Sequence, residues 1–90
     1  MTIPQQIMTG VGGLIRQSGR EVFTRKDIRN QLGVESHLWK NSYNPTFQGM
    51  RIDEPGGAPD LGERFQGVFR RVSHGKYQLT DYGNKLLSEF

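Results

Sequence analysis

The chain of 90 residues contains no cysteine. Disulfide bonds and thiolate metal sites are therefore excluded, and the fold has to be stabilised by packing and hydrogen bonds. The only two histidines, His37 and His74, lie far apart in the sequence and are poor material for another kind of metal cluster. We therefore expect no metal ion and no other cofactor.

Long apolar runs are also missing. The longest apolar segment is far shorter than the roughly 20 residues that span a membrane as a helix. The first residues, MTIPQQ, lack the basic and apolar order of a secretion signal. We expect a protein that does not associate with membranes and is located in the cytoplasm.

Hydrophobic residues make up only 33% of the chain, which allows one domain with a small core and no large substrate cleft. The sequence contains no nucleophile and base at a recognisable spacing, no phosphate-loop glycine pattern and no convincing pair of carboxylates. We therefore expect a single domain over residues 1–90 that is not an enzyme and has no small-molecule substrate.

Acidic residues are concentrated in one segment, residues 53–63, which is rich in glycine and proline and holds no base. This composition predicts a loop. The rest of the chain carries all 12 basic residues against five acids. Such segregation favours a polyanionic partner, most often nucleic acid, although a basic surface that only aids solubility would look similar. The acids of the segment are Asp53, Glu54, Asp60 and Glu63.

A first helix is predicted from about residue 3 to residue 18, where Ser18 and Gly19 end it. Its apolar residues recur on one helical face, and Thr2 and Gln5 are placed as a capping box. Three glycines interrupt it, so either the helix is marginal there or another element packs close against its backbone. The apolar residues are Ile3, Ile7, Val11, Leu14 and Ile15, and the glycines are Gly10, Gly12 and Gly13.

A short β-prone segment, EVF at residues 21–23, leads directly into a second predicted helix, RKDIRNQL at residues 25–32. Thr24 has the side chain and the position of its N-cap, and Asp27 lies in the first turn, where the helix dipole favours an acid. Gly33 is the natural C-cap because glycine adopts the left-handed conformation without strain. We therefore expect a short strand followed by a well-delimited helix.

A third helical pattern carries an aromatic stripe at i, i+4, i+8 and i+11. A single helix here places four polar residues together on the opposite side. Stacking of the aromatic rings on unpaired bases is a second interpretation, but helical spacing favours burial in the core. The stripe is Trp39, Tyr43, Phe47 and Met50, and the polar residues are Asn41, Asn44, Gln48 and Arg51.

Pro45 lies inside this pattern, and proline in a helix interior breaks or kinks the helix. We therefore expect an irregular turn from Ser36 to about Tyr43. Asn44 is then the N-cap and Pro45 the first residue of a short helix that ends near residue 52. On this shorter helix three side chains remain near or on the exposed side, namely Thr46, Gln48 and Arg51.

The segments FQGVFRRV and KYQLT flank the dipeptide HG, which is typical of a β-hairpin whose glycine adopts positive φ. With a two-residue loop, Val72 pairs with Tyr77 and Arg70 with Leu79. A three-residue loop would shift this register, so the sequence leaves open which face Arg70 and Arg71 point to.

Thr80 and Asp81 open a last predicted helix. This helix has an apolar edge, formed by Leu86, Leu87 and Phe90, and is too short to be stable alone. The edge therefore packs either on the domain itself or on a partner. The second alternative predicts a possible homodimer through the C-terminal helix.

The segment FTRKDIRNQLGV resembles the first helix of a helix-turn-helix with its glycine turn, and FRRVSHGKYQLT resembles the hairpin wing, in the order found in the winged helix-turn-helix superfamily. The resemblance implies an α+β fold of three helices, a hairpin wing, a short strand before the second helix and a C-terminal helix. Two features depart from the simple pattern. The span from residue 34 to residue 44 is longer than the usual turn, and the acidic loop at residues 53–63 is an insertion before the wing.

The resemblance implies a sequence-reading protein that binds double-stranded DNA, as a transcription regulator or as the DNA-recognition module of a larger system. Its recognition helix, about residues 44–52, would enter the major groove, and its basic wing, residues 70–77, would contact the backbone or the minor groove. The recognition residues would be Asn44, Thr46, Gln48 and Arg51. The wing residues would be Arg70, Arg71, His74 and Lys76. Further DNA-backbone contacts would come from Arg25, Lys26, Arg29 and Lys40.

Other interpretations stay open from the sequence alone. The polar face of the third helix can be simply the solvated face, and bases at a hairpin tip can serve solubility or prevent edge pairing. Winged helices also act as protein-interaction or dimerisation modules without direct DNA contact. The acidic loop and the C-terminal apolar edge are the features that favour this alternative.

Overall fold

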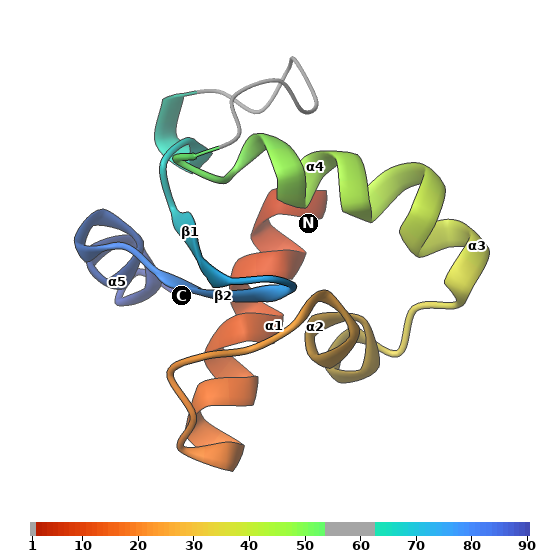
Figure 1. The fold of residues 1–90 in the computed structure, drawn as a ribbon, viewed down its shortest axis with the longest axis horizontal. Helices are drawn as coiled ribbons and strands as arrows, with labels where there is room; N and C mark the ends of the chain where they lie inside the picture. The colour runs from red at the N-terminus through yellow and green to blue at the C-terminus, as the bar shows by residue number, and fades with distance from the viewer. Residues whose placement is uncertain (1, 54–62) are drawn as a thin grey trace.

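The computed structural model describes residues 2–53 and 63–90 (Figure 1). This part of the chain contains helices and one two-stranded antiparallel sheet, so the prediction of an α+β fold is confirmed. Most of the predicted acidic loop, residues 54–62, lies outside the described residues. The elements in chain order are α1 (Ile3–Ser18), α2 (Arg25–Leu32), α3 (Ser36–Leu38), the π-helix η1 (Trp39–Tyr43), α4 (Asn44–Gly49), the 3-10 helix η2 (Glu63–Phe65), β1 (Phe69–Ser73), β2 (Lys76–Leu79) and α5 (Asp81–Leu87).

Helix α1 begins and ends where the sequence predicts. The Gln5 side chain accepts from the Thr2 amide at 2.9 Å and the Thr2 hydroxyl accepts from the Gln5 amide at 3.4 Å, which completes the capping box. Gly19 closes the helix in the left-handed conformation, with φ of 71°. These local signals are sufficient to set both ends because each satisfies backbone groups that have no partner within the helix.

The glycines of α1 mark places where other helices approach its backbone. A Cβ atom on Gly10 would lie 2.8 Å from a methyl carbon of Leu32 in α2. A Cβ atom on Gly12 would lie 3.0 Å from a methyl carbon of Leu87, in α5. Of the two alternatives left open by the sequence, close packing is therefore confirmed, and α1 is continuous through its glycines.

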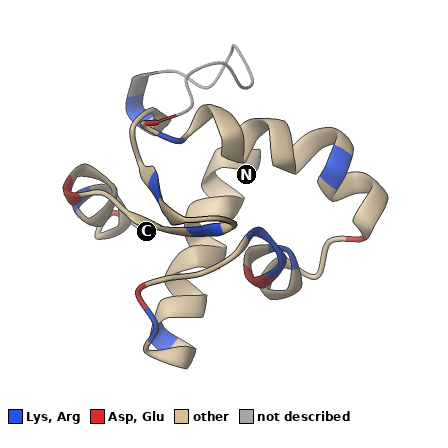
Figure 2. Cartoon of the chain, in the orientation of Figure 1, with Lys and Arg blue, Asp and Glu red and all other residues tan. Residues whose placement is uncertain are grey.

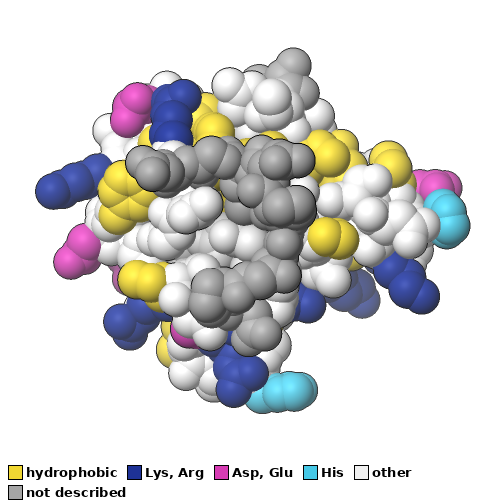
Figure 3. All heavy atoms as spheres, turned by 90° about the horizontal axis from the view of Figure 1, so that it is seen from above, with side chains coloured by type: hydrophobic (Ala, Val, Ile, Leu, Met, Phe, Trp, Pro, Cys, Tyr) yellow, Lys and Arg dark blue, Asp and Glu magenta, His cyan; other side chains and the backbone are white. Residues whose placement is uncertain are grey.

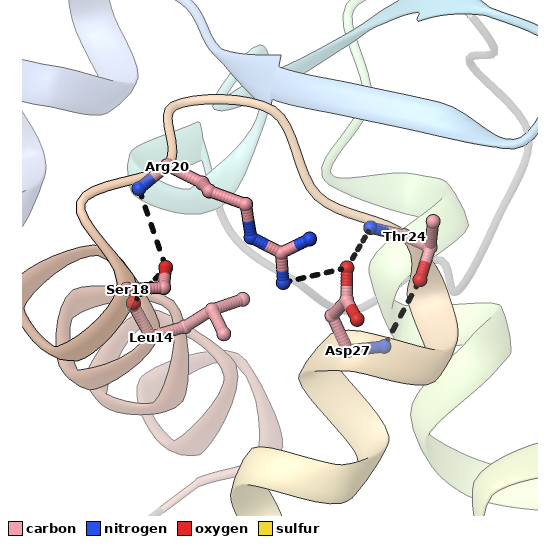
Figure 4. Close-up of polar contacts among 5 residues, drawn as sticks. All are labelled: Leu14, Ser18, Arg20, Thr24 and Asp27. Atoms are coloured by element: carbon pink, nitrogen blue, oxygen red, sulfur yellow. Dashed lines mark hydrogen bonds and ion pairs between the residues drawn. The ribbon is translucent and has the colours of Figure 1, made fainter.

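The connection between α1 and α2 is held by a short network of hydrogen bonds (Figure 4). The Ser18 hydroxyl donates to the Leu14 carbonyl at 2.7 Å and accepts from the Arg20 amide at 3.2 Å. At the start of α2, the Asp27 carboxylate accepts from the Thr24 amide at 2.9 Å, and the Thr24 hydroxyl accepts from the Asp27 amide at 3.1 Å. The Arg20 guanidinium lies 3.5 Å from the same carboxylate. The predicted N-cap of α2 is thus confirmed.

Helices α3, η1 and α4 form one continuous helix over residues 36–49 (Figure 1). The predicted irregular turn before Pro45 and the N-cap at Asn44 are therefore wrong, since Asn44 has helical φ and ψ of −63° and −45°. Its amide donates to the Trp39 carbonyl, five residues earlier, which is the π-helical pattern. The wider π turn takes one extra residue just before Pro45, and we attribute the continuity of the helix across the proline to this turn.

The aromatic stripe of this helix faces the core, as predicted from its spacing. The Trp39 and Tyr43 rings stack with centroids 6.1 Å apart. The Phe47 ring contacts two rings of the hairpin, Phe69 at 4.9 Å and Tyr77 at 5.0 Å between centroids. The helix 36–49 is therefore fixed against the hairpin by aromatic packing. All four residues of the stripe, Trp39, Tyr43, Phe47 and Met50, are buried.

The hairpin turn falls at His74 and Gly75, as predicted, but the strand register is shifted. Leu79 is paired with Phe69 and not with Arg70, and the pairs Arg70 with Gln78 and Arg71 with Tyr77 follow. A bulge between Arg71 and Ser73 leaves Val72 as an extra residue in β1. This bulge explains why the register predicted from a plain two-residue loop is wrong by one position.

Two single-residue bridges extend the sheet on either side. Phe23 pairs with Tyr77 of β2 through two backbone hydrogen bonds of 2.9 and 2.8 Å, and Arg51 forms a parallel bridge with Phe69 of β1. The short strand expected before α2 is thus present as one bridge. These two bridges bring the start of α2 and the segment after α4 to opposite edges of the hairpin.

Helix α5 begins at its predicted N-cap, where the Thr80 hydroxyl accepts from the Gly83 amide at 3.0 Å. A Cβ atom on Gly83 would overlap the carbonyl oxygen of Val68, so this position has no space for a side chain. The start of α5 therefore packs directly on the backbone that precedes β1.

The apolar edge of the C-terminal helix packs on the domain itself. Leu86 is buried, Leu87 contacts the core, and the Phe90 ring lies 6.2 Å from the Phe65 ring. The first of the two alternatives stated from the sequence therefore accounts for Leu86 and Leu87, whereas Phe90 stays 38% exposed. The homodimer remains an untested prediction.

Candidate functional site

Three segments that are far apart in the sequence line one hollow of about 490 Å³, which we call the basic hollow. They are the start of α2, the end of α4 together with Arg51, and the hairpin. Figure 2 shows the blue positions at the start of α2 close to those of the hairpin. No carboxylate from residues 2–53 or 63–90 is part of the lining. The lining residues are Thr24, Arg25, Lys26, Gln48, Arg51, Arg71, His74, Gly75 and Tyr77.

Arg25 lies between the aromatic core and the basic hollow. Its guanidinium carbon is 5.6 Å from the centre of the Phe47 ring and 5.3 Å from that of Tyr77, which is within the range of cation–π attraction. One terminal nitrogen donates to the side-chain carbonyl of Gln48. The Nε atom of Arg25 is buried and has no hydrogen-bond partner among the described residues.

Arg51 is buried, with only 5% of its side chain exposed, so the prediction that it lies on the exposed side of a helix is wrong. The reason is that residue 51 follows the helix and bridges to β1, which directs its side chain beneath the hairpin. Its guanidinium carbon lies 5.0 Å from the centre of the Tyr77 ring. It donates to Gln48 Oε1 at 3.2 Å and to Asp53 Oδ1 at 3.1 Å.

Gln48 joins these two arginines. Its single carbonyl oxygen accepts from both Arg25 and Arg51, and the side chain is half-buried. Bidentate recognition of adenine by glutamine uses this oxygen together with the amide nitrogen. This oxygen already accepts from two guanidinium groups, so it is not free to pair with a base. In this structure Gln48 orients the two arginines.

Thr46 is only 6% exposed, and its hydroxyl donates to the Ser42 carbonyl at 3.1 Å. The prediction that it remains near the exposed side is therefore wrong. In the continuous helix Thr46 lies one turn from the fully buried Met50 and shares its side. Asn44 is half-buried, and its Oδ1 atom is buried without a hydrogen-bond partner among the described residues.

The exposed polar residues of the helix 36–49 lie mainly in its first half. His37, Lys40 and Asn41 are exposed, and Asn41 Nδ2 lies 3.0 Å from a ring nitrogen of His37. Sequence reasoning did not include His37 and Asn41 among the site residues. A single helix through Pro45 places Asn41 on its polar side, but the break expected at Pro45 leaves it outside the predicted recognition helix.

The sequence-predicted site residues divide into two groups. Six of them lie together in the lining of the basic hollow: Arg25, Lys26, Gln48, Arg51, Arg71 and His74. The other six lie outside this lining: Arg29, Lys40, Asn44, Thr46, Arg70 and Lys76. Among the latter, Arg29 donates from Nε to the Val34 carbonyl at 3.0 Å and so closes the C-terminal end of α2.

Asp53 links the segment after α4 to the hairpin. Its Oδ1 accepts from Arg51 and its Oδ2 accepts from the Arg71 amide at 2.8 Å. Slight burial tends to raise the pKa of this carboxyl, but the two hydrogen bonds and the charge of Arg51 outweigh it. The pKa of Asp53 is therefore below its ordinary value, and the carboxylate is ionised at neutral pH.

A second groove, of about 470 Å³, lies on the other side of the hairpin. Two large apolar side chains in it are exposed, Ile52 at 61% and Tyr82 at 42%. On the face seen in Figure 3 the visible hydrophobic side chains form separate groups, and the visible lysines and arginines lie toward the rim. The groove is lined by Ile52, Gly67, Arg70, Gln78, Leu79, Thr80, Asp81 and Tyr82.

Comparisons with protein-family models, with curated proteins and with solved structures found no match. The class is therefore defined by geometry alone, as a small α+β domain with a basic hollow between a helix N-terminus and a hairpin. Within residues 2–53 and 63–90, no three acidic or histidine side chains are grouped so that they could hold a metal ion. In the same residues no helix combines the length and the apolar character needed to cross a membrane.

Proposed function

We propose that the chain is a winged-helix domain that binds double-stranded DNA, as a transcription regulator or as a DNA-recognition module. One observation carries the proposal. Residues from α2, from the end of α4 and from the hairpin line one hollow that contains several bases and, in the described part of the chain, no carboxylate. A surface of this kind favours a polyanion such as the phosphate backbone of DNA.

In this proposal the helix 36–49, and not a shorter helix over residues 44–52, enters the major groove. An α-helix is narrow enough for this groove, and an asparagine can bind adenine through two hydrogen bonds. Asn41 is exposed and has both the donor and the acceptor that this contact needs. Lys40 is exposed beside it and can contact phosphate.

The hairpin serves as the wing and contacts the DNA backbone or the minor groove. Arg71 and His74 lie at the basic hollow, and Lys76 is exposed next to the turn. Such contacts position a protein on the duplex and are largely independent of sequence. Base discrimination then comes from the helix and general affinity from the hairpin and α2.

Titration of a fluorescently labelled duplex with the purified chain at several salt concentrations tests the proposal. Several phosphate contacts demand a steep loss of affinity with salt, because each contact releases bound counterions. A logarithmic slope of about −0.9 per phosphate contact is expected. No binding at low salt, or binding with no salt dependence, contradicts the proposal.

A protein-interaction module is the second candidate, and the exposed Ile52 and Tyr82 in the groove behind the hairpin are the observation that favours it. Exposed apolar side chains in a groove are typical of surfaces that bind a partner. Replacement of Ile52 by serine distinguishes the two candidates, because the change leaves the basic hollow intact. DNA binding by this variant equal to that of the unmodified chain supports the first candidate.

A further inference from the structure

We infer that the basic hollow is a binding site for one phosphoryl group, held by Arg25 and Lys26 of α2 and by Arg71 and His74 of the hairpin. The proposed function makes this group a phosphodiester of the duplex, and that choice of source rests on the proposed function. The site itself is defined by the charges and donors that converge on the hollow.

The first argument is the unbalanced charge beside the hollow. The guanidinium groups of Arg25 and Arg51 both lie within 5.3 Å of the Tyr77 ring centre and share one neutral acceptor, the Gln48 carbonyl. Among the described residues the one carboxylate bonded to this pair is Asp53, and it binds Arg51 and the Arg71 amide. Two like charges that are partly removed from water repel each other, and an anion in the hollow offsets this repulsion.

The second argument is the set of backbone donors at the start of α2. The amides of Arg25 and Lys26 are the first two of α2, where no carbonyl of the same helix can accept from them. Thr24 accepts from the next two amides only, through its hydroxyl at 3.1 Å and its carbonyl at 3.2 Å. The start of α2 therefore presents free donors and a favourable dipole to an anion.

The nearest acid at the start of α2 does not fill this role. The Asp27 carboxylate accepts from the Thr24 amide and lies 3.5 Å from the Arg20 guanidinium, on the side of the α1 connection (Figure 4). It is not part of the lining of the hollow. Among the described residues, Asp53 therefore pairs with Arg51, and no carboxylate pairs with the side chains of Arg25, Lys26 and Arg71.

The geometry of the donors indicates the class of ligand. Basic side chains line the hollow from α2 and from the hairpin, so a ligand with acceptor oxygens on several sides can contact more of them than a planar carboxylate can. A phosphoryl group has several acceptor oxygens arranged around one centre and fits such a set. The hollow is also open to solvent, so a group attached to a longer chain can enter it.

Amide signals from ¹⁵N-labelled chain test the site directly. Inorganic phosphate is titrated at constant ionic strength, with sodium chloride as the matched salt. We expect saturable shifts of the Arg25, Lys26 and Gly75 signals with phosphate and none of this kind with chloride. If phosphate causes only non-saturating shifts like those seen with chloride, the inference is wrong, even when the duplex binds.

Two variants make the result specific. Lys26→Gln combined with Arg71→Gln removes two exposed charges of the lining and should weaken phosphate about tenfold or more, since charge-assisted hydrogen bonds are lost. Lys85→Gln removes one exposed charge from α5 and should leave the affinity unchanged. If the double variant does not fold, Lys26→Gln alone is compared with Lys85→Gln. Equal affinity in the lining variant and the control overturns the inference.

A duplex arm separates the two possible sources of the group. If the duplex binds and competes with phosphate for the same amide signals, the phosphodiester assignment holds. If phosphate saturates the site but the duplex does not bind, the proposed function fails and the hollow is a site for a free phosphorylated ligand. If the duplex binds without shifting these signals, the phosphodiester assignment fails while double-stranded DNA binding by the chain stands.

Discussion

The two sides of the hairpin differ although they are built from neighbouring residues of the same strands. Arg71 lies at the basic hollow, next to Tyr77 and the start of α2. Arg70, the preceding residue, lies in the groove on the other side with Ile52 and Tyr82. Two adjacent arginines thus belong to surfaces of different chemistry, because successive side chains of a strand point to opposite faces. Basic residues that are adjacent in the sequence therefore need not lie on the same surface of the folded chain.

The largest expected effect is a loss of folding stability caused by a substitution at Gly83, on the groove side of the hairpin. Gly83→Ala should destabilise the fold by about 3 kcal/mol or more, because the new methyl group overlaps the backbone carbonyl of Val68 and cannot be relieved by a rotamer change. Urea denaturation followed by circular dichroism measures the loss. Gly10→Ala is the control, since its neighbour is the end of the Leu32 side chain, and it should cost much less. Equal losses in the two variants would contradict the role of Val68.

On the side of the basic hollow, Tyr77→Leu should cost about 2 kcal/mol of folding free energy. The change removes the ring that faces Arg25 and Arg51 and that contacts Phe47. Tyr82→Leu, in the groove, should cost about 1 kcal/mol or less, because this ring is 42% exposed and loses mainly the hydrogen bond from its hydroxyl to the Arg64 carbonyl. Chemical denaturation of both variants compares the two sides, and the reverse order of stability would show that the comparison is wrong.

Arg71→Gln and Arg70→Gln are a matched pair for binding. If the basic hollow contacts phosphate, Arg71→Gln should weaken duplex affinity about tenfold and lower the salt slope by about 1, whereas Arg70→Gln should change both only slightly. Fluorescence anisotropy with the same labelled duplex measures both. Equal losses from the two substitutions would mean that the two faces of the hairpin do not differ in function.

The smallest expected effect concerns pH. Because the pKa of Asp53 is lowered in the folded chain, its contribution to stability is present above the ordinary aspartate pKa of about 3.9 and is lost as the pH falls through the folded value. The carboxylate is exposed, so solvent screening keeps this contribution below about 1 kcal/mol. Thermal unfolding between about pH 5 and pH 2 should show a shallower acid decline for Asp53→Asn than for the unmodified chain. Identical pH profiles for Asp53→Asn and the unmodified chain would show that this carboxylate does not contribute to the acid decline.

Signals that act over a few residues predicted much of the fold. Thr2 and Thr24 cap their helices, and Gly19 and Gly33 end them in the left-handed conformation, as expected. Each of these positions satisfies backbone groups within one turn, so no distant contact is needed to predict it. Helical spacing likewise identified the aromatic core, because one face of a helix has to be buried.

The candidate site was predicted only in part, because its geometry depends on contacts between distant segments. Proline propensity predicted a break at Pro45, but the helix continues through a π turn while its aromatic face stays packed on the hairpin. Burial of Arg51 depends on its bridge to Phe69, which no local pattern reports. Packing against the rest of the chain therefore outweighed local preference at both positions.

The sequence by itself determined the ends of α1 and α2, the start of α5, the hairpin turn and the aromatic stripe of the core, since these depend on capping, glycine conformation and the period of apolar residues. Only the tertiary structure decided which charged side chains meet. The extra residue Val72 in β1 sets the face of Arg71, and the bridges at Phe23 and Arg51 bring α2 and the end of α4 to the same hairpin. Such juxtaposition follows from long-range pairing, which no short stretch of sequence encodes.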